Sequence, residues 1–516
     1  MKRVFIALIA LCFMVGGWPG LLRANVLEPL VDVDHPAVIA HEETPVYVLI
    51  QYQVESIEED ATQPRPALNL GLVIDRSGSM ADRGKLEYAK KAAAILVDQM
   101  HPPDRLAVVQ YDDRISVLWP SSMVEVPDMI KRRINALSPG GATNLAGGMM
   151  RGVDQVLDHL DPKALNRVIL LSDGLANRGI TNPIEIKKLV RKAKKRGVHI
   201  SSMGLGADYN EDLMQSIAEY AGGNYYYIES PGQMARIFQQ EMSILFATVA
   251  KQLNLRFVAT EAVQSVEVFG FPYQKNGLKT LIEQEDVYAG ENRSVLLRLM
   301  LRPQPEGDID LGNVQLSYQD MTAEDTTVSI DKKIHVLATP DTEKVAQAEN
   351  TQITAEATLI EAEKRHEESI LLFEKGRKKE ALQHIQQLEE DLKEKNTSLS
   401  EPTIAKKIDA LAMEAEEMKA AEQSQVHKST YLKKSKQRLY KAQKGKRGKY
   451  ILQEGDSGYD VEKLQQALQG EDVYHGSVDG QYSEELRKAV ETFQRQEHLT
   501  VDGIAGPRTM KALGIY

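Results

Sequence analysis

The strongest constraint on the fold is an apolar run that ends in a polar turn. The run Leu70-Gly71-Leu72-Val73-Ile74 is followed at once by Asp75, Ser77 and Ser79, which form a D-x-S-x-S pattern. A short apolar run bounded by a turn indicates a buried strand. We therefore expect an acid and two hydroxyls at the carboxyl end of a core strand.

Two later loops carry further oxygen ligands. Thr143 and Asp173 each follow a predicted structural boundary, about 70 and 100 positions after Asp75, and in an alternating strand/helix fold such loops converge on one crevice. All five side chains offer oxygen, with no Cys or His nearby, a set that favours Mg²⁺, Ca²⁺ or Mn²⁺ over Zn²⁺. The sequence thus predicts a site for one hard divalent cation.

The three loops together resemble the von Willebrand factor type A domain and its metal-ion-dependent adhesion site. They read DRSGSM (75–80), PGGATNLAGG (139–148) and LSDGLANRG (171–179), and the resemblance extends over roughly residues 66–250. It implies direct metal contact by Ser77, Ser79 and Thr143, with Asp75 and Asp173 acting through water or by direct contact. The sequence of this segment also resembles bacterial relatives of the calcium-activated chloride-channel-like A-domain proteins.

Charge and coordination number indicate binding rather than catalysis. Two carboxylates match a dication, and one octahedral position is left for an outside ligand, for which an Asp or Glu carboxylate of a partner protein is the natural choice. Hydrolysis would require a general base and a pocket, but the three loops contain no His and no unpaired Glu. We therefore expect a protein that is not an enzyme.

The pattern on either side predicts a doubly wound, Rossmann-like α/β domain inserted in a β-sandwich. Alternating strands and helices cover 66–252, ending in a helix over about 232–252, whereas period-2 segments in 25–65 and 253–338 predict antiparallel strands. The first segment is too short to bury its own face. We expect the two segments to share one sandwich.

The region that follows is rich in Glu, Lys, Ala, Gln and Leu and predicts helices over 341–425, which act as a spacer or a packing surface. Residues 426–450 then carry ten Lys or Arg, from Lys428 to Lys449, and no acids. We expect a basic linker here, either solvated and flexible or able to grip anionic envelope polymers.

The last segment, 451–516, resembles the peptidoglycan-binding domain type 1. The resemblance rests on Gly455-Asp456-Ser457-Gly458 and on two Val-Asp-Gly turns, at 478–480 and 501–503. It implies a small three-helix module, although Ser483 and Leu486 stand where the family often has Gly and Thr. From turn exposure and aromatic stacking, the candidate glycan contacts are Asp479, Tyr482 and Asp502.

The N-terminus predicts secretion. Residues 1–24 combine a basic start, an apolar stretch and a small residue at position 24, as in a signal peptide, with an uncleaved membrane anchor as the alternative. The only cysteine, Cys12, would be lost with the signal. Cleavage would also remove three positive charges, which takes the net charge from −11 to −14 and disfavours nucleic acid as a partner.

These patterns favour an adhesion-type scaffold of the bacterial envelope, in the periplasm or at the cell surface. One end binds a protein through Mg²⁺, Ca²⁺ or Mn²⁺, and the other end rests on peptidoglycan. One alternative is a regulatory subunit of an envelope transporter or wall-remodelling complex. A second is a wall hydrolase, although the 11 histidines are scattered and form no catalytic set.

Overall fold

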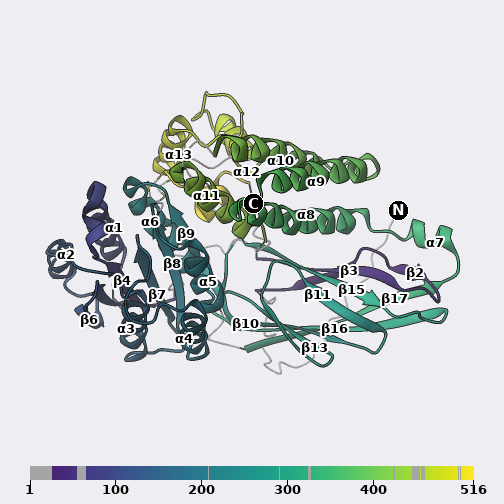
Figure 1. Ribbon diagram of the computed structural model, residues 1–516, viewed down its shortest axis with the longest axis horizontal. Helices are drawn as coiled ribbons and strands as arrows, with labels where there is room; N and C mark the ends of the chain where they lie inside the picture. Colours follow the sequence, from purple (N-terminus) through teal and green to yellow (C-terminus); the bar gives the residue numbers. More distant parts are fainter. Residues whose placement is uncertain are drawn as a thin grey trace, which may run out of the picture.

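The computed structural model describes residues 26–54, 66–100, 102–206, 208–289, 291–322, 327–421, 425–443, 452, 454, 459–497, 499, 501 and 503–515. The predicted signal peptide with Cys12 lies outside this part of the chain, as does Asp502. Figure 1 shows an α/β domain at one end, a long β-sandwich at the other and helices above both. No helix in the described residues is both long and apolar enough to cross a bilayer.

The α/β domain is built on a six-stranded sheet of order β6-β5-β4-β7-β8-β9, parallel except for the edge strand β6. Its strands are β4 (Leu68–Asp75), β5 (Arg105–Tyr111), β6 (Ile115–Met123), β7 (Leu165–Ser172), β8 (His199–Leu205) and β9 (Tyr225–Ile228). The central strand β4 is buried along its whole length, because helices cover both faces of a doubly wound sheet. The apolar run at 70–74 therefore forms the core strand that its composition predicts.

Two layers of helices enclose this sheet. One face is covered by α1 (Lys85–Gln99), α2 (Pro127–Asn135) and α6 (Met234–Phe246), and the other by α3 (Leu145–Leu157), α4 (Pro183–Lys195) and α5 (Glu211–Ala221). The predicted fold class is confirmed. The last helix was predicted to reach residue 252, but α6 ends at Phe246 and β10 begins at Thr248, because the chain there joins the second sheet of the sandwich.

The sandwich takes strands from both sides of the α/β domain. One sheet has the order β1-β3-β15-β11 and the other β12-β13-β10-β16-β17-β2, with β14 paired to β10. These strands are β1 (Pro29–Val33), β2 (Ala37–Ile39), β3 (Thr44–Gln53), β10 (Thr248–Ala259), β11 (Val263–Val268), β12 (Tyr273–Asn276), β13 (Lys279–Glu283), β14 (Val287–Tyr288), β15 (Asn292–Leu301), β16 (Gly307–Asp320) and β17 (Thr327–Thr339). Residues of both sheets share one apolar core, so the segment before the α/β domain completes the sandwich that follows it.

The helical region lies against the rest of the molecule. It consists of α7 (Thr342–Gln347), α8 (Thr351–Glu374), α9 (Lys378–Leu399), α10 (Pro402–Ala420) and α11 (Gln425–Gln443). Ile353, Ala357 and Ile360 of α8 pack on Leu49, Phe269 and Leu296 of the sandwich. The region is therefore a packing surface rather than a free spacer.

Residues 425–443 are helical, so the expected flexible linker over 426–450 is wrong for the part of that range that the structure describes. The helix α11 lies on the α/β domain. Lys433, only 2% exposed, donates to Tyr209 O (2.9 Å) and Glu211 Oε2 (2.5 Å). Tyr440 joins the core on the α5 side of the sheet and meets the Tyr225 ring edge-on at 5.9 Å. Within the described part of this range, Lys433, Lys434 and Lys436 pair with acids of the α/β domain, namely Glu211, Glu229 and Asp212.

In its described residues, the C-terminal module has three helices around one small core, namely α12 (Tyr459–Gly470), α13 (Glu484–Gln496) and α14 (Pro507–Ala512). The module also contacts the α/β domain. Arg236 of α6 donates to the Glu454 carbonyl (2.6 Å), and the Glu454 carboxylate lies 3.2 Å from Arg487 of α13. The last helix of the α/β domain is thus linked through one residue to the C-terminal module.

Candidate metal centre

The first loop of the predicted site begins where β4 ends. Asp75 is the last residue of the strand and has no exposed surface. Its Oδ1 accepts a hydrogen bond from Ser77 N (2.8 Å), and its Oδ2 accepts one from Ser172 Oγ (2.8 Å) and one from Tyr111 OH (3.3 Å). The carboxylate is therefore held by residues at the ends of β5 and β7, and it orients the turn that carries Ser77 and Ser79.

The three predicted loops do converge. Gly78 N donates to Gly141 O (2.9 Å) and Gly140 N to Arg76 O (2.6 Å), so the first loop is joined to the second. Thr143 N donates to Asn177 Oδ1 (2.8 Å), which joins the second loop to the third. Backbone and side-chain hydrogen bonds thus fix the loops before any ligand is considered.

The second loop depends on a close backbone approach at Gly140. A Cβ at this position would lie 1.8 Å from Asp112 Oδ2. That carboxylate is buried, forms an ion pair with Arg76 (2.6 Å) and accepts from Arg114 N (2.6 Å). Asp112 and Arg76 therefore brace the site, although neither was predicted to belong to it.

The hydroxyls gather beside the second carboxylate. Ser77 Oγ lies 3.2 Å from Ser79 Oγ, and Ser79 Oγ donates to Asp173 Oδ1 (2.8 Å). A Cβ built on Gly174 would lie 3.3 Å from Thr143 Oγ1 and 3.6 Å from Ser79 Oγ. Both hydroxyls therefore face the same small space, next to the Asp173 carboxylate.

This donor set fits a hard dication, and all five predicted residues lie together. In the described part of the chain no three His, Cys, Asp or Glu side chains gather as a metal site, so a cation here would depend on hydroxyl oxygens. Ser, Thr and Asp oxygens suit Mg²⁺ or Ca²⁺. Ser77, Ser79 and Thr143 would hold the ion, together with the carboxylates of Asp75 and Asp173.

Because the carboxylates of Asp75 and Asp173 are both buried, their negative charge requires a positive charge nearby. Desolvation raises the pKa of Asp75 to about 6, hydrogen bonds from Ser77 and Ser172 lower it, and the nearby Asp173 charge raises it. Burial also raises the pKa of Tyr111 well above its ordinary value, with Asp75 adding to the rise. An unmatched negative charge at Asp75 is thus costly, and a bound cation would offset it.

One cation of the protein is already at the site. Lys85 Nζ lies 2.6 Å from Asp173 Oδ2, and the two side chains are 8% and 0% exposed. Lys85 is the first residue of α1 and follows the short helix η1 (Gly78–Gly84). Lys85, Tyr111 and Ser172 were not predicted to belong to the site, and of these only Ser172, directly before Asp173, lies in one of the three predicted loops.

For the residues that it describes, the structure does not place the predicted glycan contacts of the C-terminal module on one binding surface. Tyr482 is 2% exposed and its hydroxyl donates to Gly503 O (3.1 Å), so the expected aromatic stacking surface is wrong. Asp479 accepts from Gln465 Nε2 (2.8 Å) and Gln481 N (2.9 Å), which indicates a turn-stabilising role. Leu486, at a departure from the family pattern, is fully buried, and Ser483 caps α13.

Comparison with known families agrees with this architecture. Residues 69–240 match the family model of the von Willebrand factor type A domain, and residues 457–513 match that of the "Putative peptidoglycan binding domain". "Uncharacterized protein YfbK" of Escherichia coli is 30% identical over 247 residues, which are 46% of this chain and 43% of that protein. "Uncharacterized protein sll0103" of Synechocystis is 29% identical over 277 residues, or 52% and 65% of the two chains. The chain thus spans less than two thirds of either relative.

A solved structure shares the fold over most of the chain. The von Willebrand factor type A protein from Catenulispora acidiphila superposes with a TM-score of 0.62 at 16% sequence identity, and the match covers 83% of this chain and 99% of that one. At this identity the likeness concerns the fold alone. It extends well beyond residues 69–240, so the α/β domain, sandwich and helices recur together as one arrangement.

Proposed function

We propose that this protein is a scaffold of the bacterial envelope that binds a partner protein through a divalent metal. The proposal starts from its von Willebrand factor type A domain and its peptidoglycan binding domain. Domains of the first kind commonly hold a divalent metal and engage protein partners, and a domain of the second kind suggests association with the cell wall. The protein is not an enzyme in this proposal. The partner supplies an Asp or Glu carboxylate to the metal, which is Mg²⁺, or Ca²⁺ or Mn²⁺ in its place.

One observation carries the proposal. The hydroxyls of Ser79 and Thr143 and the carboxylate of Asp173 surround the same small space at the carboxyl end of the sheet, although they come from three loops. When bound there, a dication supplies a positive charge that can attract an anionic side chain of another protein. The residues of the chain hold the loops rigid, so little ordering is needed when the partner arrives.

The contact between the two domains supports a scaffold. Glu454 lies beside both Arg236 of the metal-binding domain and Arg487 of the C-terminal module, and α11 rests on the face formed by α5 and β9. A partner held at the metal would therefore be kept at a defined distance from the wall-binding module.

Calorimetry and sedimentation of the full chain test the two halves separately. We expect Mg²⁺, Ca²⁺ or Mn²⁺ to bind with a stoichiometry of one, and Asp173→Asn to abolish this binding. Asp154→Asn, an exposed position on α3, is the matched control. Both variants should sediment with purified peptidoglycan as the unaltered protein does. Absence of metal uptake by the unaltered chain would overturn the metal-dependent half, and absence of sedimentation would overturn the wall-binding half.

A further inference from the structure

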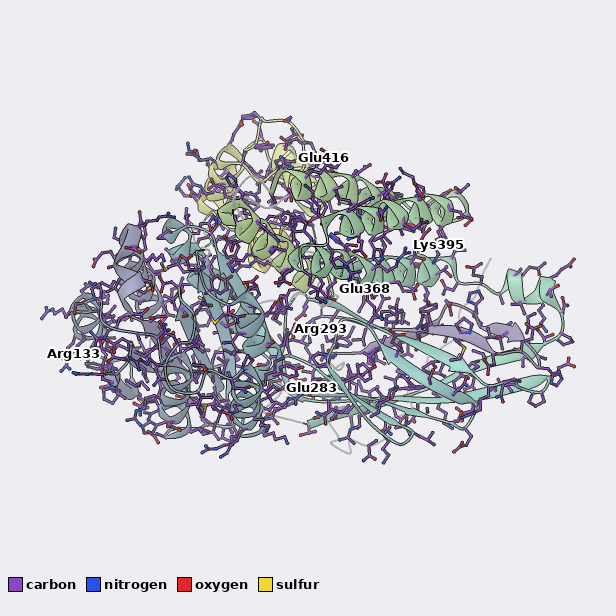
Figure 2. The ribbon with its side chains drawn as sticks, in the orientation of Figure 1. Arg133, Glu283, Arg293, Glu368, Lys395 and Glu416 are labelled. Atoms are coloured by element: carbon purple, nitrogen blue, oxygen red, sulfur yellow. The ribbon has the colours of Figure 1, made fainter. Side chains whose placement is uncertain are left out.

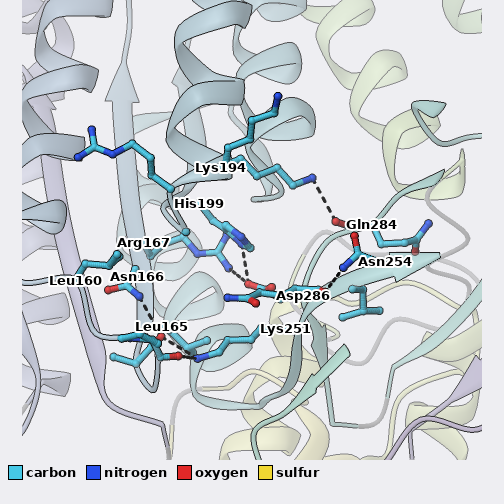
Figure 3. A pocket seen from close by; sticks show the side chains of 17 residues that line it. Leu160, Leu165, Asn166, Arg167, Lys194, His199, Lys251, Asn254, Gln284 and Asp286 are labelled. Atoms are coloured by element: carbon cyan, nitrogen blue, oxygen red, sulfur yellow. Dashed lines mark hydrogen bonds and ion pairs between the residues drawn. The ribbon is translucent and has the colours of Figure 1, made fainter. Parts of the chain in front are cut away.

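A cavity of about 490 Å³ lies where the α/β domain meets the sandwich, at the opposite end of the β-strands from the metal centre. Figure 3 shows that its walls come from both domains. The α/β domain contributes the start of β7 with the segment before it, and the α4–β8 connection with the start of β8, whereas the sandwich contributes residues 251–254 together with Gln284 and Asp286. A volume of this size is typical of pockets for small molecules.

The lining is strongly basic in a chain whose net charge is −11. Five Lys or Arg side chains line the cavity, against the single carboxylate of Asp286. The five are Arg167, Lys194, Lys195, Arg196 and Lys251. Low-dielectric walls lined by one sign of charge concentrate the field and attract ions of the opposite sign. The lining therefore favours an anionic ligand.

The position of Asp286 in the cavity is fixed by three neighbouring side chains. Asp286 Oδ2 accepts from Arg167 Nη2 (3.0 Å) and lies 2.9 Å from His199 Nδ1, both of the α/β domain. From the sandwich, Arg293 Nη2 donates to the Asp286 carbonyl (2.9 Å). Figure 2 places Arg293 near this junction between the two domains. The loop that carries Asp286 is thus fixed by an arginine whose own side chain is buried.

The other carboxylate oxygen has no partner. Asp286 Oδ1 is buried and accepts no hydrogen bond from any residue that the structure describes. A buried acceptor without a donor is costly, and a small rotation of the Asp286 carboxylate toward the cavity would allow a ligand hydroxyl to satisfy it. An anion alone would not, since two negative groups would then face each other.

At the entrance, the end of α4 supplies exposed positive charge. Lys195 and Arg196 both line the cavity and are exposed to solvent, while Lys194 is turned toward the Gln284 carbonyl, with Nζ at 3.4 Å from its oxygen. Exposed ammonium and guanidinium groups can approach a phosphate or carboxylate without breaking a buried ion pair.

We propose that this cavity binds a hydroxylated organic anion, such as a sugar that carries a phosphate or a carboxylate. One hydroxyl donates to Asp286 Oδ1, and the anionic group lies near Lys195 and Arg196. Such a ligand contacts both domains and stabilises their junction. This site is separate from the metal centre, so the proposal can be refuted without affecting the proposed function.

Calorimetry with glucose 6-phosphate, glucose, inorganic phosphate and gluconate distinguishes recognition of the hydroxyl from recognition of the anionic group. We expect glucose 6-phosphate to bind the full chain at least tenfold more tightly than either glucose or inorganic phosphate, because only the ester offers both hydroxyl and anion. Gluconate in place of the ester tests a carboxylate as the source of the charge. If neither glucose 6-phosphate nor gluconate binds more tightly than inorganic phosphate, the proposal is wrong.

Two sets of variants locate the binding. The double variant Lys195→Ala/Arg196→Ala should weaken binding of the preferred anion by roughly tenfold. The double variant Lys188→Ala/Lys192→Ala removes the same charge from exposed positions of the same helix outside the cavity, and it should leave affinity unchanged. Equal loss in both pairs would show general charge attraction and would overturn the site. Asp286→Asn should remove the preference for the sugar ester over inorganic phosphate, and a retained preference would contradict the hydroxyl contact.

Discussion

Lys85 Nζ lies 2.6 Å from Asp173 Oδ2 in a setting where neither side chain has more than 8% of its surface exposed. The protein thus provides its own counter-charge for one of the two carboxylates at the candidate metal centre. Lys85 balances the charge of Asp173, and a dication at the candidate site would have to compete with Lys85 for this carboxylate.

Replacement of Lys85 tests this competition. Lys85→Met leaves the buried Asp173 without its partner, a change that costs about 3–5 kcal/mol when a buried pair is broken. We expect a lower melting temperature in EDTA, together with a tighter Mg²⁺ affinity and a larger rise in melting temperature on addition of Mg²⁺. Lys91→Met, on the exposed side of the same helix, should change neither property. Weaker Mg²⁺ binding in Lys85→Met would mean that Lys85 supports the ion instead of competing with it.

Asp75 should limit stability at neutral pH. Its pKa rises from 3.8 to about 6 on folding, chiefly through burial, so the folded protein binds this proton more tightly than the unfolded chain does. Stability from this group is therefore greatest below pH 3.8 and is lost as pH rises to about 6. The Asp75→Asn variant avoids the charge, and its amide can donate to the Ser172 and Tyr111 hydroxyls.

We accordingly expect Asp75→Asn to raise the stability of the metal-free protein above pH 6, by on the order of 2–3 kcal/mol, while Mg²⁺ binding is lost. Denaturant unfolding in EDTA at pH 7 and at pH 4 measures the effect. The gain should shrink at pH 4, and an equal gain at both values would rule out ionisation of Asp75 as its cause.

The junction of the two domains should show the opposite pH dependence. Burial raises the pKa of Asp286, but the charges of His199, Arg167 and Lys251 outweigh it and bring the value down to about 2. The stability that this carboxylate contributes is present above about pH 4 and is lost as pH falls toward 2. Asp286→Asn should therefore cost about 2 kcal/mol at pH 7, and the difference from the unaltered protein should narrow below pH 4. A difference that stays constant down to pH 2.5 would contradict this ionic origin.

The docking of α11 should depend on its tyrosine more than on its surface lysine. Tyr440 is buried in the core of the α/β domain, so Tyr440→Ala should destabilise the protein by about 3–5 kcal/mol. Lys434 forms an ion pair with Glu229 (2.8 Å) in which both side chains are more than 40% exposed, and Lys434→Ala should cost less than about 1 kcal/mol. Hydrogen exchange at the edge strand β9 reports the docking directly, and unchanged protection in Tyr440→Ala would show that α11 does not cover this edge in solution.

Tyr482 should matter for stability and not for wall binding. Its buried hydroxyl donates to Gly503 O, so Tyr482→Phe should cost roughly 1 kcal/mol in thermal unfolding. Sedimentation with purified peptidoglycan should be unaffected, because the ring is not at the surface. A variant that keeps its stability but no longer sediments would restore the tyrosine as a glycan contact.

The candidate metal centre could be located from the sequence because its five residues stand in short loops with a distinct chemistry. Asp75 ends a strand whose apolar run predicts its burial, and Ser77 and Ser79 follow in the next turn. Thr143 and Asp173 follow from the alternation of strands and helices, since parallel strands bring their carboxyl ends to one edge. Tyr482 was misjudged because a tyrosine next to a turn looks the same in sequence whether its ring faces solvent or core.

Thus the sequence alone indicated the oxygen donors of the candidate metal site, the doubly wound domain, the division of the sandwich into two segments and the identity of the C-terminal module. Each of these follows from motifs and hydrophobic periodicity that can be recognised along the chain without knowledge of its long-range contacts. The tertiary structure alone decided the pairing of Lys85 with Asp173, the docking of α11 and the basic cavity around Asp286. These depend on contacts between residues as far apart as 224 positions, and only the folded chain brings such charges out of water and next to one another.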